Sequence, residues 1–144
     1  MNSRILSTAV GVVFLLTIIF LDAPAWPADE PEDAAQSAAE SWLKLVDAEQ
    51  YGESWEQAAS LFKNAVTSEQ WEQAAGRVRG PLGELVSRKI SSRKYTEQLP
   101  GVPDGKYVVI QFDAVFENKA SAVETVTPML DEDGVWRVSG YFIK

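Results

Sequence analysis

Residues 123–144 read VETVTPMLDEDGVWRVSGYFIK and decide the fold of the chain. Two runs of alternating apolar residues flank Asp131–Gly134, and the glycine supplies the positive φ that hairpin loops favour. This pattern predicts a β-hairpin. If Leu130 pairs with Val135, the residues facing each other on one side of the hairpin are Met129 and Trp136, Thr127 and Val138, Thr125 and Gly140, and Val123 and Phe142.

A further strand is predicted from Tyr107 to Glu117. Its even-numbered residues form an unbroken apolar face, namely Val108, Ile110, Phe112, Ala114 and Phe116. A turn at Asn118–Ser121 with a two- or four-residue loop would place this face beside Val123 and Met129. The preceding segment, Leu85–Glu97, is rich in cations, which is typical of an edge strand protected against pairing with other chains. A binding site for an acidic ligand is the alternative for this segment.

Apolar residues recur at helical spacing in three earlier segments, which begin near Asp33, Tyr51 and Thr67. The third segment has the best start signal, because Thr67 can cap the helix and Gln70 can complete a capping box. We therefore predict an α+β fold, with three N-terminal helices packed on one face of a curved antiparallel meander of about four strands.

The N-terminal segment predicts export. Arg4 precedes an apolar run from Ile5 to Leu21, and Ala23-Pro24-Ala25 offers small residues at the positions that a signal peptidase recognises. We predict a signal peptide over residues 1–25, a flexible lead-in over 26–32 and a single domain over 33–144, located in the periplasm or secreted. An uncleaved membrane anchor is the alternative.

The composition excludes several classes of function. A net charge of −8 is unfavourable for binding nucleic acid or an anionic membrane. The chain has no histidine and no cysteine, which removes Ser-His-Asp and Cys-His catalysis and every histidine-ligated metal site. We predict no catalytic residue, no metal and no cofactor.

The segment from Ala38 to Lys144 resembles a bacterial family, domain-of-unknown-function 4019. The resemblance is carried by AAESWLKLVDAEQYGESWEQAASLFKNAVTSEQW, RGPLGELVSRK, YVVIQFDAVFENK and SAVETVTPMLDEDGVWRVSGYFIK. It implies a small exported protein whose fold is similar to the cystatin-like, nuclear-transport-factor-2-like α+β fold. No catalytic motif accompanies the family, so the resemblance assigns no functional residue, and the fold alone does not select a function.

One candidate site is a pocket inside the cone between helices and sheet. Small residues would form a row across the core face there, and aromatic residues of the helices would complete the lining. The predicted lining is Trp42, Tyr51, Trp55, Ala114, Thr125 and Gly140. Alternatively Trp42 or Trp55 fills the space, as large residues opposite small ones normally do.

The other candidate site is the opposite face of the sheet. Polar groups there form either a carboxylate pair with a positioned arginine or ordinary cross-strand pairs. The apolar residues among them are too many for a solvated face, which predicts self-association. The predicted interface is Val109, Asp113, Glu124, Val126, Arg137, Tyr141 and Ile143.

Two functions fit these patterns. One is a non-catalytic exported binding or assembly domain whose partner is a second copy or an envelope protein. The other is a histidine-free enzyme or small-ligand binder of the cystatin-like kind, which would use Asp, Glu, Tyr or Arg inside the cone. A polar group in a hollow cone would favour the second function, and a tryptophan-filled cone the first.

Overall fold

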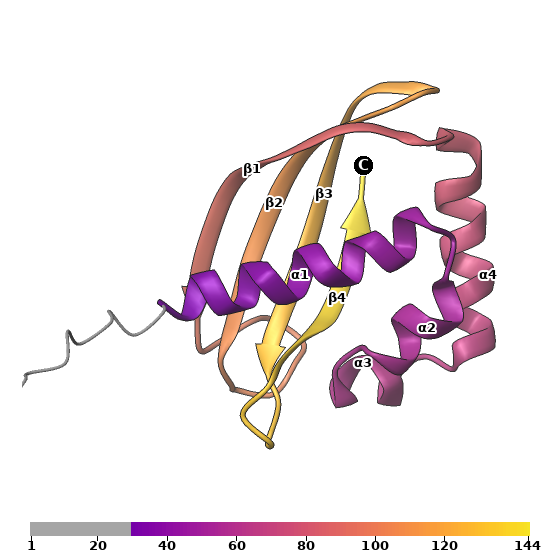
Figure 1. Cartoon of the computed structure of the whole chain (residues 1–144). Helices are drawn as coiled ribbons and strands as arrows, with labels where there is room; N and C mark the ends of the chain where they lie inside the picture. Colours follow the sequence, from indigo (N-terminus) through magenta and orange to yellow (C-terminus); the bar gives the residue numbers. More distant parts are fainter. Residues whose placement is uncertain (1–29) are drawn as a thin grey trace, which may run out of the picture.

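The computed structural model describes residues 30–144 (Figure 1). The predicted signal peptide and most of the predicted lead-in lie outside these residues. Residues 30–144 form an α+β fold in which four α-helices and a short 3-10 helix are followed by a four-stranded antiparallel sheet of order β1-β2-β3-β4. In order, the elements are α1 (Pro31–Asp47), α2 (Tyr51–Glu56), α3 (Ser60–Ala65), α4 (Ser68–Arg79), η1 (Gly80–Leu82), β1 (Leu85–Thr96), β2 (Tyr107–Phe116), β3 (Lys119–Leu130) and β4 (Trp136–Ile143).

Helix α1 follows its predicted apolar stripe. It begins at Pro31, two residues before the predicted start, because proline is well suited to the first turn of a helix. Pro31 and Glu32 therefore belong to the helix and not to the lead-in. The buried residues of α1 are Ala35, Ala39, Trp42, Leu43 and Val46. No helix among the described residues is long and apolar enough to cross a bilayer.

The second predicted helix is divided into α2 and α3. The chain leaves the helical path at Ala58 and Ala59, because Ala59 N–H donates a 2.8 Å hydrogen bond to the backbone oxygen of Val138 in β4. The capping box of α4 is confirmed, with Gln70 N–H donating to Thr67 Oγ1 at 3.2 Å and Thr67 N–H donating to Gln70 Oε1 at 2.9 Å.

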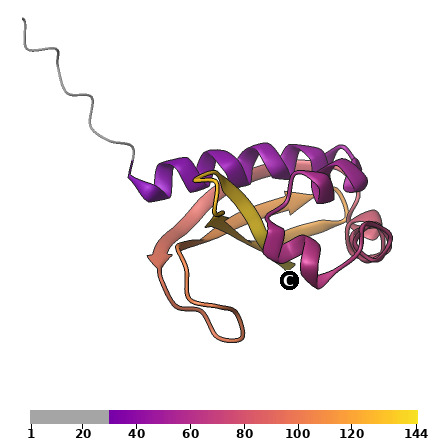
Figure 2. The same cartoon turned by 90° about the horizontal axis from the view of Figure 1, so that it is seen from below.

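The helices leave one face of the sheet bare. Helix α1 contacts all four strands, α3 packs on β4, and α4 packs mainly against α2, beyond the β4 edge (Figure 1). Seen from below, α1 lies on one side of the sheet, and of the described segments only the β1–β2 loop projects from the other side (Figure 2). We call the helix-covered side the inner face and the opposite side the outer face.

The terminal hairpin forms, but its predicted register is wrong. Leu130 pairs with Trp136 and Met129 with Arg137. The shift arises because Asp131 N–H donates a hydrogen bond to Val135 O, which extends the pairing of β3 with β4 by one residue into the predicted loop. Gly134 has a φ of 78°, as predicted for the turn.

A bulge at Ser139 then changes which residues of β4 face inward. Val138 pairs with Pro128 and Gly140 with Thr127, so Ser139 has no partner of its own. Pro128 lacks an N–H for the ladder, which is why proline in a strand occurs with bulges. The Ser139 hydroxyl donates to the Thr127 carbonyl at 2.7 Å. As a result Val138 and Tyr141 both face inward, although they are an odd number of residues apart.

A second bulge moves the side chains of β3 to the face of the sheet opposite the predicted one. The turn is Glu117–Asn118, with Phe116 paired to Lys119, whereas the next registered pair is Ala114 and Ala122. Ala120 and Ser121 therefore oppose Val115 alone, and such an extra residue shifts every later side chain to the other face. The even-numbered residues of β2 face inward, as predicted, but they are joined by the even-numbered residues of β3.

Candidate functional site

The described residues contain a largely buried cluster of ion-paired side chains that joins the helices to the sheet. Arg88 on β1 donates from Nε to Glu124 Oε2 at 2.6 Å, and its two terminal nitrogens donate to Asp47 at 2.7 and 2.9 Å. Arg79, at the end of α4, donates to Asp47 Oδ1 at 2.7 Å. We call Asp47, Arg79, Arg88, Glu124 and Tyr141 the charge network.

Glu124 is the deepest member and is fully buried. Its Oε1 accepts a 2.6 Å hydrogen bond from the Tyr141 hydroxyl and lies 3.6 Å from a terminal nitrogen of Arg79. That nitrogen also donates to the Tyr141 oxygen at 3.4 Å. Because a buried charge is tolerated only when it is paired, the two arginines are what allow two carboxylates to face the core.

The electrostatics favour the charged forms of Asp47 and Arg88 and the neutral form of Tyr141. Burial opposes the ionisation of Asp47, but hydrogen bonds from Arg88 and Arg79 outweigh it and lower the pKa of this carboxyl. Burial also opposes the charged form of Arg88, yet its bonds to Asp47 and Glu124 raise its pKa. Burial and the Glu124 charge raise the pKa of Tyr141, which therefore keeps its proton and donates it in a hydrogen bond.

Two concave regions flank the network. A cleft of about 340 Å³ includes Asp47, Tyr51, Arg79, Glu84 and Glu117 in its lining. A groove of about 480 Å³ between α1 and β1 includes Lys44 and Arg88. Arg79 Nε is buried without a hydrogen-bond partner in the described residues, and the Arg79 guanidinium carbon lies 4.8 Å from the centre of the Phe116 ring.

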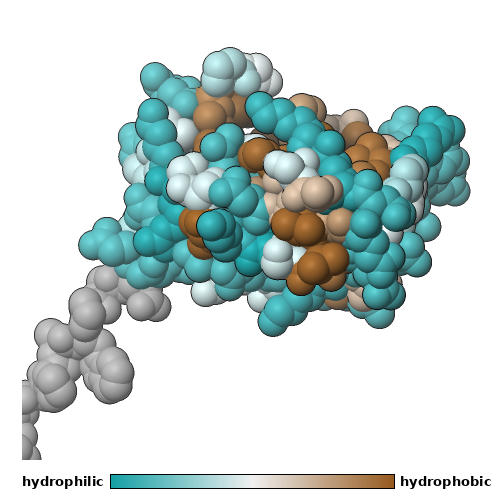
Figure 3. All heavy atoms as spheres, turned by 90° about the horizontal axis from the view of Figure 1, so that it is seen from above, coloured by the Kyte–Doolittle hydropathy of each residue, from teal (hydrophilic) through white to brown (hydrophobic). Residues whose placement is uncertain are grey.

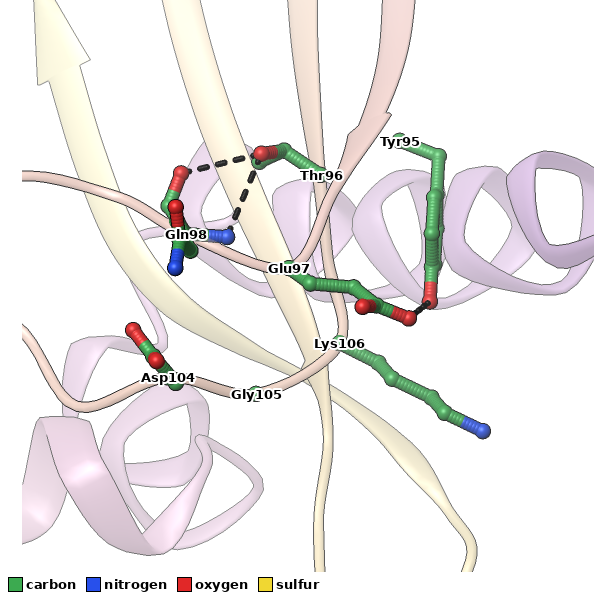
Figure 4. Close-up of a pocket in the computed structure, with 7 residues that line it drawn as sticks. All are labelled: Tyr95, Thr96, Glu97, Gln98, Asp104, Gly105 and Lys106. Atoms are coloured by element: carbon green, nitrogen blue, oxygen red, sulfur yellow. Dashed lines mark hydrogen bonds between the residues drawn. The ribbon is translucent and has the colours of Figure 1, made fainter.

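A third hollow lies apart from the network, at the β1–β2 loop (Figure 4). Its volume is about 710 Å³, and it is open to solvent. The side chains around it bond to their own neighbours: the Tyr95 hydroxyl donates to Glu97, and Thr96 Oγ1 contacts the backbone of Gln98. Within residues 30–144 no group of three acidic side chains could hold a metal ion.

The three aromatic residues predicted to line a pocket differ in position, and only Trp42 fills the interior. Trp42 is buried, its ring centre lies 5.6 Å from that of Trp71 and 5.5 Å from that of Tyr141, and its Nε1 donates to the Ser54 carbonyl at 2.8 Å. Trp55 packs at the margin of the core and donates to the Val66 carbonyl at 2.8 Å. Tyr51 lines the 340 Å³ cleft.

The predicted row of small residues does not exist. Ala114 lies on the inner face, packed with Phe116 and Ala122. Thr125 and Gly140 lie on the outer face, because the bulges at Ala120–Ser121 and Ser139 reverse β3 and the end of β4.

The same reversals correct the predicted interface. Val109 and Asp113 lie on the outer face as predicted, and Arg137 is partly exposed and paired with Asp131 and Asp133. Four residues of the predicted interface turn inward instead: Glu124, Val126, Tyr141 and Ile143. Tyr141 packs on Trp42 and Trp71, and Ile143 packs against the cluster around Ala114.

Sequence reasoning missed the charge network. It placed Glu124 outside because alternation counted from the predicted loop and turn put Val123, Thr125 and Thr127 on the inner face, and it treated Arg88 as part of an exposed run. Two signals for the bulge in β4 were present, since Pro128 and Gly140 both stand inside predicted strands. We find no comparable signal for the bulge at Ala120–Ser121.

Comparison with known proteins assigns the chain to a protein family. A family model described as "Protein of unknown function (DUF4019)" matches residues 38–141. No curated protein and no solved structure matches the chain. The matched segment runs from α1 to Tyr141 in β4, and so contains every member of the charge network. The chain therefore belongs to the DUF4019 family, and the resemblance noted in the sequence is confirmed.

Proposed function

We propose that the protein is a small exported, non-catalytic binding or assembly domain built on a cystatin-like cone. The observation that carries this proposal is the filled interior. The rings of Trp42, Phe62, Trp71 and Tyr141 contact one another between helices and sheet, with centre-to-centre distances from 5.1 to 6.3 Å. Such packing occupies the space in which a cystatin-like enzyme would hold its substrate.

The ionisable groups of the interior support the same proposal. Both oxygens of Glu124 and both oxygens of Asp47 already accept hydrogen bonds, and the Tyr141 hydroxyl donates one of them to Glu124. A general acid or base needs a free lone pair or proton that reaches the substrate. Glu124 is fully buried and does not reach a substrate, and the network ties α1 and α4 to the sheet.

The outer face is the surface that we propose for binding. It carries Val109, Val115, Val123, Met129 and Phe142, which we call the outer patch. The Phe142 side chain is 60% exposed, and the other four residues are half-buried although no helix of residues 30–144 covers them. Elsewhere the surface is mixed: from the end that carries the β2–β3 turn, apolar patches alternate with hydrophilic residues (Figure 3).

Export is the part of the proposal that rests on sequence alone, from Arg4 through Ala25. Mass spectrometry of the protein recovered from its own cells should find Trp26 as the first residue. Recovery of the intact chain in the membrane fraction would replace export by anchoring.

One observation favours the alternative, a small-ligand binder or histidine-free enzyme. Arg79 lines the 340 Å³ cleft, and its buried Nε has no acceptor among the described residues. A ligand that bears a carbonyl or carboxylate would meet this need. In nuclear magnetic resonance titrations with acetate and acetamide, saturable shifts confined to this cleft would support the alternative.

Site-specific photo-crosslinking in the native cell tests the binding role. A photoreactive phenylalanine analogue at Thr125 lies in the middle of the outer face, and the same analogue at Gln73 lies on the exposed side of α4. We expect a discrete adduct from position 125 and none from position 73. Equal adducts from both positions, or none from either, would contradict a specific binding role for the outer face.

A further inference from the structure

We infer that the partner of the outer face is a second copy of this chain, packed face to face about a two-fold axis parallel to the strands. The inference rests on the binding role proposed above and names its partner. Two sheets that pack face to face keep their strands aligned to within about 30°. A two-fold axis along the strands satisfies this geometry and makes the interface self-complementary.

Cross-strand pairing shows which residues such an axis would bring together. Ser92, Gln111, Thr125 and Phe142 form one row across the outer face, from the β1 edge to the β4 edge. An axis along the strands exchanges the two edges and keeps the height of each row. Phe142, the most exposed member of the outer patch, then faces Ser92 of the other copy, so that the largest side chain of the row lies opposite the smallest.

The neighbouring row repeats this shape complementarity. Lys94 pairs with Val109 on the β1 side, and Thr127 pairs with Gly140 on the β4 side, one residue along from the Ile110–Val126 pair. The exchange of edges places the long Lys94 side chain over Gly140 of the other copy, where there is no side chain to obstruct it. The valine and threonine side chains in the middle of the sheet complete an apolar centre.

Charge distinguishes this axis from the other possible one. Lys94 lies at the end of the sheet that carries the β3–β4 loop, but on the opposite edge. In that loop Asp131 and Asp133 are paired with Arg137, and Glu132 is exposed between them. The axis along the strands brings Lys94 of each copy toward the acidic loop of the other. An axis across the strands would place Lys89 and Lys94 of both β1 strands together, and like charges oppose association.

Sedimentation velocity of the purified protein with charge-reversal variants tests the arrangement. We expect the wild type to form a dimer at micromolar concentration. Lys94→Glu and Glu132→Lys should each weaken the dimer at least tenfold, and the double variant should recover most of the wild-type affinity. The control is Glu40→Lys on α1, which should leave the dimer unchanged. Lys94, Glu132 and Glu40 are all exposed. Circular dichroism should show the same fold throughout.

Two outcomes would overturn the inference. A wild-type protein that is monomeric at high micromolar concentration excludes a second copy as the partner. A dimer that the double variant fails to restore excludes this axis. Either result leaves the proposed function standing if the photo-crosslinker at position 125 still gives a discrete adduct in cells. The mass of that adduct must then differ from the mass of two chains. Absence of both dimer and adduct would refute the inference and the binding role together.

Discussion

The inner and outer faces of the same sheet solve opposite problems. The inner face buries Glu124 and Arg79 and partly buries Asp47 and Arg88 beside a cluster of aromatic rings, and both oxygens of each carboxylate accept internal hydrogen bonds. The outer face has valine, threonine and methionine side chains that are only half covered. Polarity therefore does not identify the buried face in this protein. The buried face is the one whose charged groups are paired and whose rings pack together.

Removal of Arg88 should have the largest effect. Arg88→Met keeps much of the side-chain length but leaves Glu124 Oε2 and Asp47 Oδ2 without their donor. Breaking a buried ion pair by removing one partner destabilises by about 3–5 kcal/mol. Urea unfolding followed by tryptophan fluorescence measures the loss. A change below about 1 kcal/mol would show that the network is solvated and that the inner face differs little from the outer.

Two aromatic substitutions should separate the centre of the core from its margin. Phe112 is 2% exposed, and Phe112→Ala should cost about 3–5 kcal/mol because it empties a fully buried site. Trp136 is only partly buried and packs at the edge of the core, so Trp136→Ala should cost clearly less. Urea unfolding of both variants checks this order, and equal losses would contradict the assignment of Trp136 to the margin.

Removal of the Tyr141 hydroxyl should have an intermediate effect. Tyr141→Phe preserves the ring contacts with Trp42 and Trp71 but removes the hydrogen bond that Glu124 Oε1 accepts from the hydroxyl. Leaving a buried acceptor without its donor costs about 1–3 kcal/mol. Thermal unfolding should show a lower midpoint with an unchanged dimer. If instead association is lost and stability kept, Tyr141 belongs to the outer face after all.

Matched valines compare the two faces directly. Val126 is fully buried on the inner face, and Val109 lies half-buried on the outer face. Val126→Thr places a hydroxyl in an apolar site and should cost about 1–3 kcal/mol. Val109→Thr should change the free energy of unfolding by less than about 0.5 kcal/mol. Similar losses from the two substitutions would remove the distinction between the faces.

Acid should weaken the inner face through Asp47. The folded state lowers the pKa of this carboxyl, so its ionised form stabilises the fold above the unfolded pKa of about 3.9. That contribution is lost as the pH falls through the folded pKa. Urea midpoints measured from about pH 6 to pH 2 should fall more steeply for the wild type than for Asp47→Asn. Parallel curves would show that Asp47 makes no such contribution.

Local patterns determined much of this fold. The α1 stripe around Trp42, the Thr67–Gln70 capping box and the inward face of Phe112 all follow from residues within one or two turns or along one strand. Helical periodicity, caps and strand alternation are short-range effects, so a single sequence suffices to predict them. The α+β class, the meander and the loop glycine Gly134 follow in the same way.

The tertiary structure alone decided which side of β3 is buried. One extra residue at Ala120–Ser121 and another at Ser139 reverse the alternation, and the side chains beyond them change faces together. Glu124 can then face the core only because Arg88 and Tyr141 arrive from other strands to bond it. A pattern read along one strand cannot show these partners, because the free energy that permits a buried charge comes from groups distant in sequence.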